Sequence, residues 1–130
     1  MKRSLVLALA MSAALMSPMA SAECSVSYVS SNALIRSALR REGWTFPRYD
    51  EVCRALQSGG AALQIEGHAA VLKGHTYAWA TVGLSDTDVP IMTFAFSGTA
   101  MRQSDQTSDD AIPALLVQTI NDAIGEIDFK

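Results

Sequence analysis

Between residues 61 and 97, apolar and polar side chains alternate with the period of two that is typical of β-strands. In the first stretch the apolar set is Leu63, Ile65, Ala69 and Val71, and the polar set is Gln64, Glu66 and His68. The dipeptide Lys73-Gly74 has the composition of a tight turn, and residues 85–88 have that of a second turn. Strands are therefore expected before the first turn, over residues 75–84, and over residues 91–96 continuing toward Ser97. The pattern predicts a three-stranded antiparallel meander.

The segment before the meander contains shorter patterns. Residues 25–29 alternate as a short strand does. Residues 34–39 repeat apolar side chains at helical spacing, behind a Ser-Ser-Asn run that offers N-caps and ahead of Gly43 as a stop. Residues 44–46 are apolar and are expected to form a buried strand. A brief helix is expected over residues 49–56.

The chain closes with a second long helix. Residues 102–108 are polar and are expected to form a loop. Asp109 or Asp110 is expected to cap the helix, and a buried apolar stripe covers residues 112–124. The order of elements predicts an α+β fold, a two-layer α/β sandwich. Its mixed sheet would contain the meander, with helices packed on one face.

The first residues have the three parts of an export signal. Lys2 and Arg3 are basic, residues 5–15 are apolar, and Ala-Ser-Ala precedes the expected cleavage point. We therefore expect residues 1–22 to be a cleaved signal peptide and residues 23–130 to be a single periplasmic domain.

Two alternatives to a cleaved leader are disfavoured by the sequence. A membrane anchor is disfavoured because the apolar run is about 12 residues long, whereas a spanning helix needs about 20. Lipidation is disfavoured because Glu23 precedes Cys24, and a carboxylate does not fit the position before a lipidated cysteine. The sequence thus favours a periplasmic or secreted chain with no membrane insertion after cleavage.

Two cysteines, Cys24 and Cys53, remain after the expected cleavage. In an oxidising compartment two cysteines of a small domain usually pair. A redox thiol would be expected in a Cys-x-x-Cys motif or beside a histidine, and neither pattern is present. The sequence favours a structural disulfide over a reactive thiol.

The order of the elements resembles that of a known class of domain. The residues that carry the resemblance are Asn32-Ala33-Leu34-Ile35, Leu39, Gly43, residues 46–49, the stretch from Gly60 to Gly67 and the helix at 111–124. In these the chain resembles small periplasmic domains of the curli-secretion-channel type. It is also similar to penicillin-binding-protein activator lipoproteins and to the N-terminal domain of the Tol translocation protein. The resemblance implies a binding or assembly domain without catalysis. The chain lacks the lipidation site of that class, so outer-membrane anchoring is not implied.

Charge restricts the partners. The formal net charge is −3, and removal of Lys2 and Arg3 with the leader makes it more negative. An acidic chain is a poor ligand for nucleic acid or for an anionic membrane. We expect a protein partner in the cell envelope. The oligomeric state does not follow from the sequence.

No catalytic or metal-binding set stands out. His68 and His75 are separated by the Lys73-Gly74 turn and have no cluster of cysteines or acids to complete a metal site. Ser97 lacks the Gly-x-Ser-x-Gly surroundings of a nucleophile. We expect no metal, no cofactor and no catalytic residue. A small hydrolase stays possible only if a histidine lies in a cleft beside an acid.

Two surfaces are candidates for binding a protein. Arg36 and Arg40 are four residues apart and share one face of the first helix. Trp44 follows that helix, and either anchors a partner beside it or packs in the core. Tyr77 and Trp79 lie on one face of the second meander strand. If that face is the one without helices, they form an exposed aromatic patch, and otherwise they are core.

The favoured function is therefore that of a non-catalytic exported domain that binds another cell-envelope protein, as an assembly or accessory factor. The alternative is an inhibitor or immunity protein against an exported enzyme or toxin. Small size, a disulfide and an acidic surface suit this alternative.

Overall fold

The structure is a computed structural model that describes residues 24–42, 44–87 and 92–129. The leader expected over residues 1–22 and the helix stop expected at Gly43 lie outside the described residues. Within these ranges the elements are β1 (Tyr28–Val29), α1 (Ala33–Glu42), α2 (Tyr49–Gly59), β2 (Ala61–Leu72), β3 (His75–Asp86), β4 (Met92–Ser104) and α3 (Ala111–Gly125).

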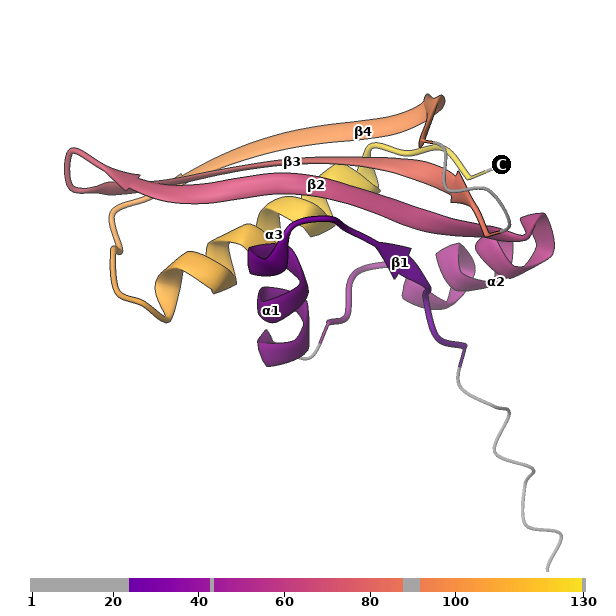
Figure 1. Cartoon of the computed structure of the whole chain (residues 1–130), viewed down its shortest axis with the longest axis horizontal. Coiled ribbons are helices and arrows are strands. Elements are labelled where there is room, and N and C mark those ends of the chain that lie inside the picture. The colour runs from indigo at the N-terminus through magenta and orange to yellow at the C-terminus, as the bar shows by residue number, and fades with distance from the viewer. Residues whose placement is uncertain (1–23, 43, 88–91, 130) are drawn as a thin grey trace, which may run out of the picture.

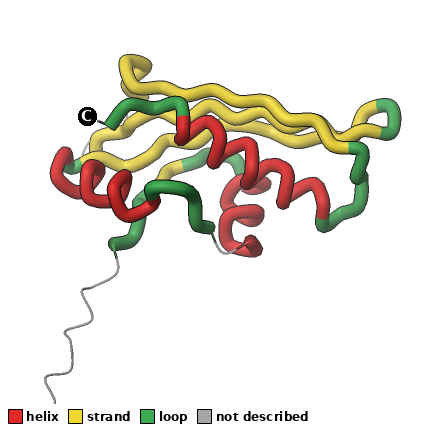
Figure 2. Tube along the Cα trace, turned by 180° about the vertical axis from the view of Figure 1, so that it is seen from behind, coloured by secondary structure: helices red, strands yellow, loops and turns green. Residues whose placement is uncertain are grey.

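The four strands form one mixed sheet in the order β1-β2-β3-β4. β1 is parallel to β2, whereas β2, β3 and β4 form the antiparallel meander. The helices α1, α2 and α3 lie on one face of the sheet, and none of the described helices lies on the other face (Figures 1 and 2). The predicted α+β fold, with helices packed on one face of a mixed sheet, is confirmed.

The core lies between the sheet and the helices. Alternation places Leu63, Ile65 and Ala69 on the covered face of β2, opposite Leu84, Val82 and Ala78 of β3. Ile65 and Val82 are fully buried, as are Leu116 and Ile120 of α3. The inward-facing side chains of the strands and the apolar side chains of α3 therefore pack in one cluster.

The helical layer approaches the sheet closely at Gly98 of β4. A Cβ atom at this position would lie 1.9 Å from the carbonyl oxygen of Ala123 and 3.1 Å from a side-chain carbon of Ile127. Only glycine allows α3 and the segment after it to pack this closely on β4.

The β2–β3 turn is formed as predicted. Lys73 and Gly74 both have positive φ angles, 51° and 78°, as a two-residue type I′ turn requires. The hairpin extends beyond the helical layer in Figure 1. Its last residues on β2, Val71 and Leu72, are consequently exposed.

The prediction of a strand over residues 44–46 is wrong. These residues form a loop whose two rings belong to a series of four: Tyr28 of β1 packs on Trp44 at 5.3 Å between centroids, Trp44 on Phe46 at 5.2 Å, and Phe46 on Tyr49 of α2 at 4.9 Å. The segment is apolar because its side chains pack in an aromatic cluster, and it is not one of the four paired strands of the sheet. The first strand is also shorter than the predicted 25–29, since β1 contains only Tyr28–Val29.

The prediction of a loop over residues 102–108 is wrong for its first three residues. β4 continues to Ser104, with Arg102 opposite Ala78 and Ser104 opposite Thr76 of β3. Arg102 is tolerated on the covered face because its guanidinium extends to the rim of α3, where it binds Asp122. The last residues of β4 are polar because the helices cover this end of the strand only partly.

The cap of α3 also differs from the prediction. Asp110 is the N-cap residue but makes no side-chain capping hydrogen bond. Instead the backbone N–H of Ala111 donates to the hydroxyl of Ser108, at 3.2 Å. The carboxylate of Asp110 pairs with Arg41 and so links the start of α3 to α1.

Candidate protein-binding surface

The uncovered face of the sheet, called the open face below, carries a row of large side chains across three strands. The register places His68 of β2 opposite Trp79 of β3, and Trp79 opposite Met101 of β4. Tyr77 lies two residues along β3, on the same face. The exposed fractions are 38% for Tyr77, 44% for Trp79 and 76% for Met101. The alternative that Tyr77 and Trp79 are core residues is therefore excluded.

The neighbours of these residues show how sharply the two faces differ. Thr76, Ala78 and Ala80 alternate with the two aromatic residues along β3 and are at most 1% exposed. Exposed apolar patches on a monomer mark binding sites more often than scattered single residues do. The row through Trp79 is such a patch, because its members are adjacent in the sheet.

The open face is nearly uncharged. Glu66 is the one acidic side chain among the outward positions of the described strand residues, and the hydroxyl of Ser31 donates to it at 3.2 Å. Thr81 and Thr99 continue the face and share a hydrogen bond of 3.2 Å between their hydroxyls. The net charge of −3 therefore resides elsewhere on the molecule. A neutral apolar partner surface could approach this face without electrostatic repulsion.

The arginine pair on α1 has a structural component. Arg36 donates from Nη1 to the carbonyl oxygen of Ser30 at 2.7 Å and so holds the connection between β1 and α1. Arg40 donates from Nε only to the carbonyl of Arg36, at 3.3 Å. Both residues are exposed. Arg36 therefore already has a role in the fold.

Trp44 belongs to the core side of the molecule. Its indole nitrogen donates to the side-chain oxygen of Asn121 on α3, at 3.0 Å, and its ring contacts Tyr28 and Phe46. The amide of Asn121 also donates to the carbonyl of Thr45. Of the two readings of Trp44, partner anchor or core residue, the structure supports the core residue.

The disulfide between Cys24 and Cys53 is present, with 6.0 Å between the Cα atoms. It links the segment before β1 to the buried side of α2. The same segment is held by the backbone N–H of Val26, which donates to the hydroxyl of Tyr49 at 3.0 Å. The predicted pairing is confirmed, and neither cysteine is a free thiol.

The two histidines lie apart. His68 pairs in register with Trp79, whereas His75 lies beside the turn and contacts Asp105 through Nδ1 at 2.8 Å. The His75–Asp105 pair is largely exposed, with 89% of the aspartate side chain accessible. Among the described residues, no group of three or more His, Cys, Asp or Glu side chains could hold a metal ion. The pair joins the start of β3, beside the hairpin turn, to the loop that follows β4.

Two arginines have raised pKa values. The pKa of Arg102 is raised above its ordinary value, chiefly by its hydrogen bonds to Asp122 and also by the charge of that carboxylate. The pKa of Arg48 is raised for the same reasons by Glu51. Both residues are cationic at any working pH, so these ion pairs fix surface geometry and supply no acid or base.

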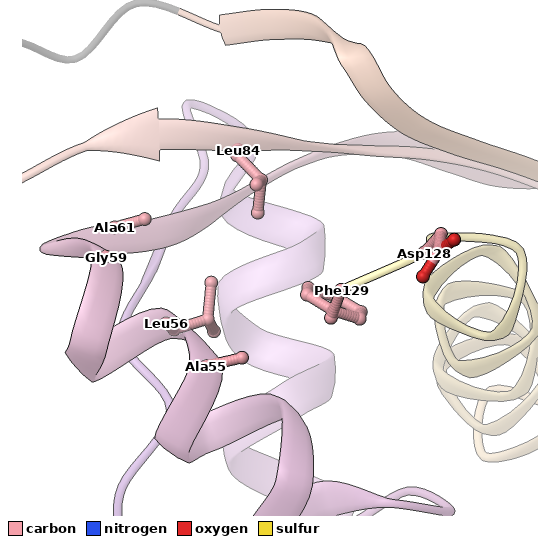
Figure 3. Close-up of a pocket in the computed structure, with 7 residues that line it drawn as sticks. All are labelled: Ala55, Leu56, Gly59, Ala61, Leu84, Asp128 and Phe129. Atoms are coloured by element: carbon pink, nitrogen blue, oxygen red, sulfur yellow. The ribbon is translucent and has the colours of Figure 1, made fainter.

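A small hollow lies between the end of α2, the first residue of β2 and the C-terminal segment (Figure 3). Its volume is about 220 Å³, below the roughly 300–1,000 Å³ of typical ligand sites. Its lining residues are Ala55, Leu56, Gly59, Ala61, Leu84, Asp128 and Phe129. The lining is mostly apolar, with Asp128 at one side. The hollow lacks the convergent polar groups that would orient a substrate.

Sequence reasoning did not single out Met101, because the third strand was expected to end near Ser97. The pattern did contain a clue: Thr99, Met101 and Gln103 continue the alternation of β4. Among the described residues, no helix combines the length and apolar character needed to cross a membrane.

No family model, no curated protein and no solved structure matches the chain. The assignment of a function therefore depends on the geometry of the open face.

Proposed function

We propose that this chain is a non-catalytic exported domain that binds another cell-envelope protein through the open face of its sheet. The observation that carries the proposal is the exposed row of Trp79 and Met101 with Tyr77 beside it, on a sheet face that no helix covers. Tyrosine and tryptophan are the side chains most enriched at the energetic centres of protein interfaces.

Three further features support binding over catalysis. The hollow near α2 is small and mostly apolar. The single histidine–carboxylate contact of the described residues, His75 with Asp105, is exposed and outside that hollow. The disulfide and the ion pairs stabilise the scaffold without placing reactive groups together. The apolar leader and the disulfide support an exported location.

A site-specific photo-crosslinking experiment tests the proposal in the cell. A photoreactive residue is placed at position 79 in one strain and at Gln57, an exposed position on α2, in a matched strain. We expect a discrete covalent adduct from position 79 and none from position 57. Equal adducts from both positions, or none from position 79, would contradict the proposal.

Affinity measurement with the crosslinked partner then tests the energetics. The double variant Tyr77→Ser and Trp79→Ser should weaken binding by about 100-fold, because two anchor residues are each worth roughly 1–2 kcal/mol or more. The control is Arg40→Ala, which removes a charge from α1. If the control weakens binding and the double variant does not, the partner binds α1 instead.

The identity of the crosslinked protein separates the two candidate functions. An assembly factor of the envelope supports the accessory function. An enzyme or toxin whose activity falls on binding supports an inhibitor or immunity function.

A further inference from the structure

The two edges of the sheet differ in how much of their backbone is covered by other segments. The β2 edge is covered at its start by β1, with Tyr28 opposite Leu63. Further along, the side-chain amide of Asn32 donates to the carbonyl of Gly67 at 2.7 Å. At the other edge, the described residues contain no strand beyond β4. The helix α3 lies beneath β4 and not beside it (Figure 1). The outer backbone groups of β4 are thus available to another strand.

The pairing of β4 with β3 is irregular just before Gly98, where the register shifts between Val82 and Leu84. The regular part that follows, residues 98–104, has little protection against pairing. It reads Gly-Thr-Ala-Met-Arg-Gln-Ser, without proline, lysine or an acidic residue. Its one charge, on Arg102, is balanced by Asp122 through two hydrogen bonds. Natural edge strands usually carry unbalanced charge, proline or a bulge that prevents pairing.

Met101 lies at the centre of this segment and is 76% exposed, more than any other large apolar side chain among the described residues. It ends the row that begins at His68 and passes through Trp79. An exposed methionine at the free end of an apolar row would be buried if the sheet continued.

We propose that β4 pairs with β4 of a second copy of this chain, antiparallel, about a two-fold axis at Met101. In this register Met101 faces Met101 of the second copy. The outer positions then match as Thr99 with Gln103 and, on the covered face, Ala100 with Arg102. No like charges lie directly opposite each other. The row of the open face continues from Trp79 of one copy to Trp79 of the other.

The area is sufficient for a specific interface. Seven paired residues extend for about 24 Å, and a sheet with one helical layer is about 20 Å thick. Contact over this whole cross-section would bury about 500 Å² on each copy, or about 1,000 Å² in total, which is near the lower limit for specific association. An interface of this size is expected to be weak and reversible. The acidic net charge of the chain opposes association only weakly, because the paired strands themselves are not acidic.

This inference goes beyond the proposed function and does not depend on it. Pairing through β4 leaves the open face of each copy uncovered. The open faces of the two copies then form one continuous surface. A partner with two copies of its binding segment would then bind both halves.

Sedimentation of the purified, disulfide-intact chain from about 1 µM to about 1 mM tests the proposal. The wild-type chain should dimerise reversibly. Met101→Lys and Met101→Asp each place like charges against each other across the axis, and each should weaken dimerisation at least about tenfold. An equimolar mixture of the two variants should restore a dimer, because opposite charges then meet at the axis. Leu72→Lys, which adds the same charge at the exposed hairpin tip, is the control and should dimerise as wild type does.

Several outcomes would overturn the inference. A wild-type chain that is monomeric throughout the range refutes edge pairing. So does a dimer that survives both Met101 variants, or one that the Tyr77→Ser and Trp79→Ser double variant dissociates while the Met101 variants do not. That last result would assign self-association to the open face. None of these outcomes decides the crosslinking result at position 79, so the two proposals fail separately.

Discussion

Removal of the disulfide should cost about 3.6 kcal/mol of stability, and the structure shows why the loss should come from the unfolded chain. The double variant Cys24→Ala and Cys53→Ala opens a loop with a sequence separation of 29. For a loop of about 30 residues, the chain-entropy model gives about 3.6 kcal/mol at 25 °C. In the folded state Val26 stays buried, and its N–H still bonds the hydroxyl of Tyr49. The native segment is therefore expected to keep its place.

The assay is thermal and urea unfolding of the oxidised wild type, the double variant, and the wild type in reductant. For a domain of about 100 residues, 3.6 kcal/mol corresponds to a decrease in Tm of roughly 15–25 °C. The urea m-value should rise, because an unfolded chain without the crosslink exposes more surface. A decrease of less than about 3 °C with an unchanged m-value would refute the reasoning. It would mean that the crosslink does not restrict the unfolded chain.

Three other perturbations test the packing and the surface. Ile65→Asp places a carboxylate at a fully buried position, which costs several kcal/mol, so the variant should lack a cooperative thermal transition. A Tm within a few degrees of wild type would show that the faces of β2 are reversed. Gly98→Ala forces its new methyl group against the backbone of α3 and should lower stability by about 2–3 kcal/mol in urea unfolding, whereas an unchanged midpoint would show that α3 can move away freely. Arg36→Ala loses the bond to the β1–α1 connection and should cost about 1 kcal/mol, while Arg40→Ala should stay within about 0.5 kcal/mol; equal effects in the same assay would contradict the structural role of Arg36.

The meander could be predicted from the sequence because its information is local. Alternation fixes which side of each strand is buried, and Lys73-Gly74 fixes the register of the first hairpin, so the burial of Ile65 followed directly. The orientation of Trp79 could not be deduced in the same way. Alternation shows that it lies opposite to Ala78 and Ala80, but alanines fit either a core or a surface. Only the position of the helices decides between the faces.

The predictions that were wrong have a common physical cause. At each of these positions a contact with a residue distant in the sequence outweighs the local conformational preference. Residues 44–46 have the composition of a strand but serve as an aromatic contact for Tyr28 and α3. Arg102 has the composition of a loop but is held in β4 by Asp122, twenty residues later. Asp110 is an excellent cap by type, yet Arg41 from a distant helix takes its carboxylate. Such partners are not visible in a local window of sequence.

The mixed topology has a consequence for the order in which the chain folds. β2, β3 and β4 pair with sequence neighbours through short connections, whereas β1 reaches β2 only across α1 and α2. Local contacts close faster than distant ones, so the meander is expected to form the folding nucleus. Substitutions inside β2 and β3 should then slow folding, whereas substitutions in β1 and α1 should mainly accelerate unfolding. The N-terminal segment would be the last to dock and the first to detach, and the link from Cys24 to α2 limits how far it can move away.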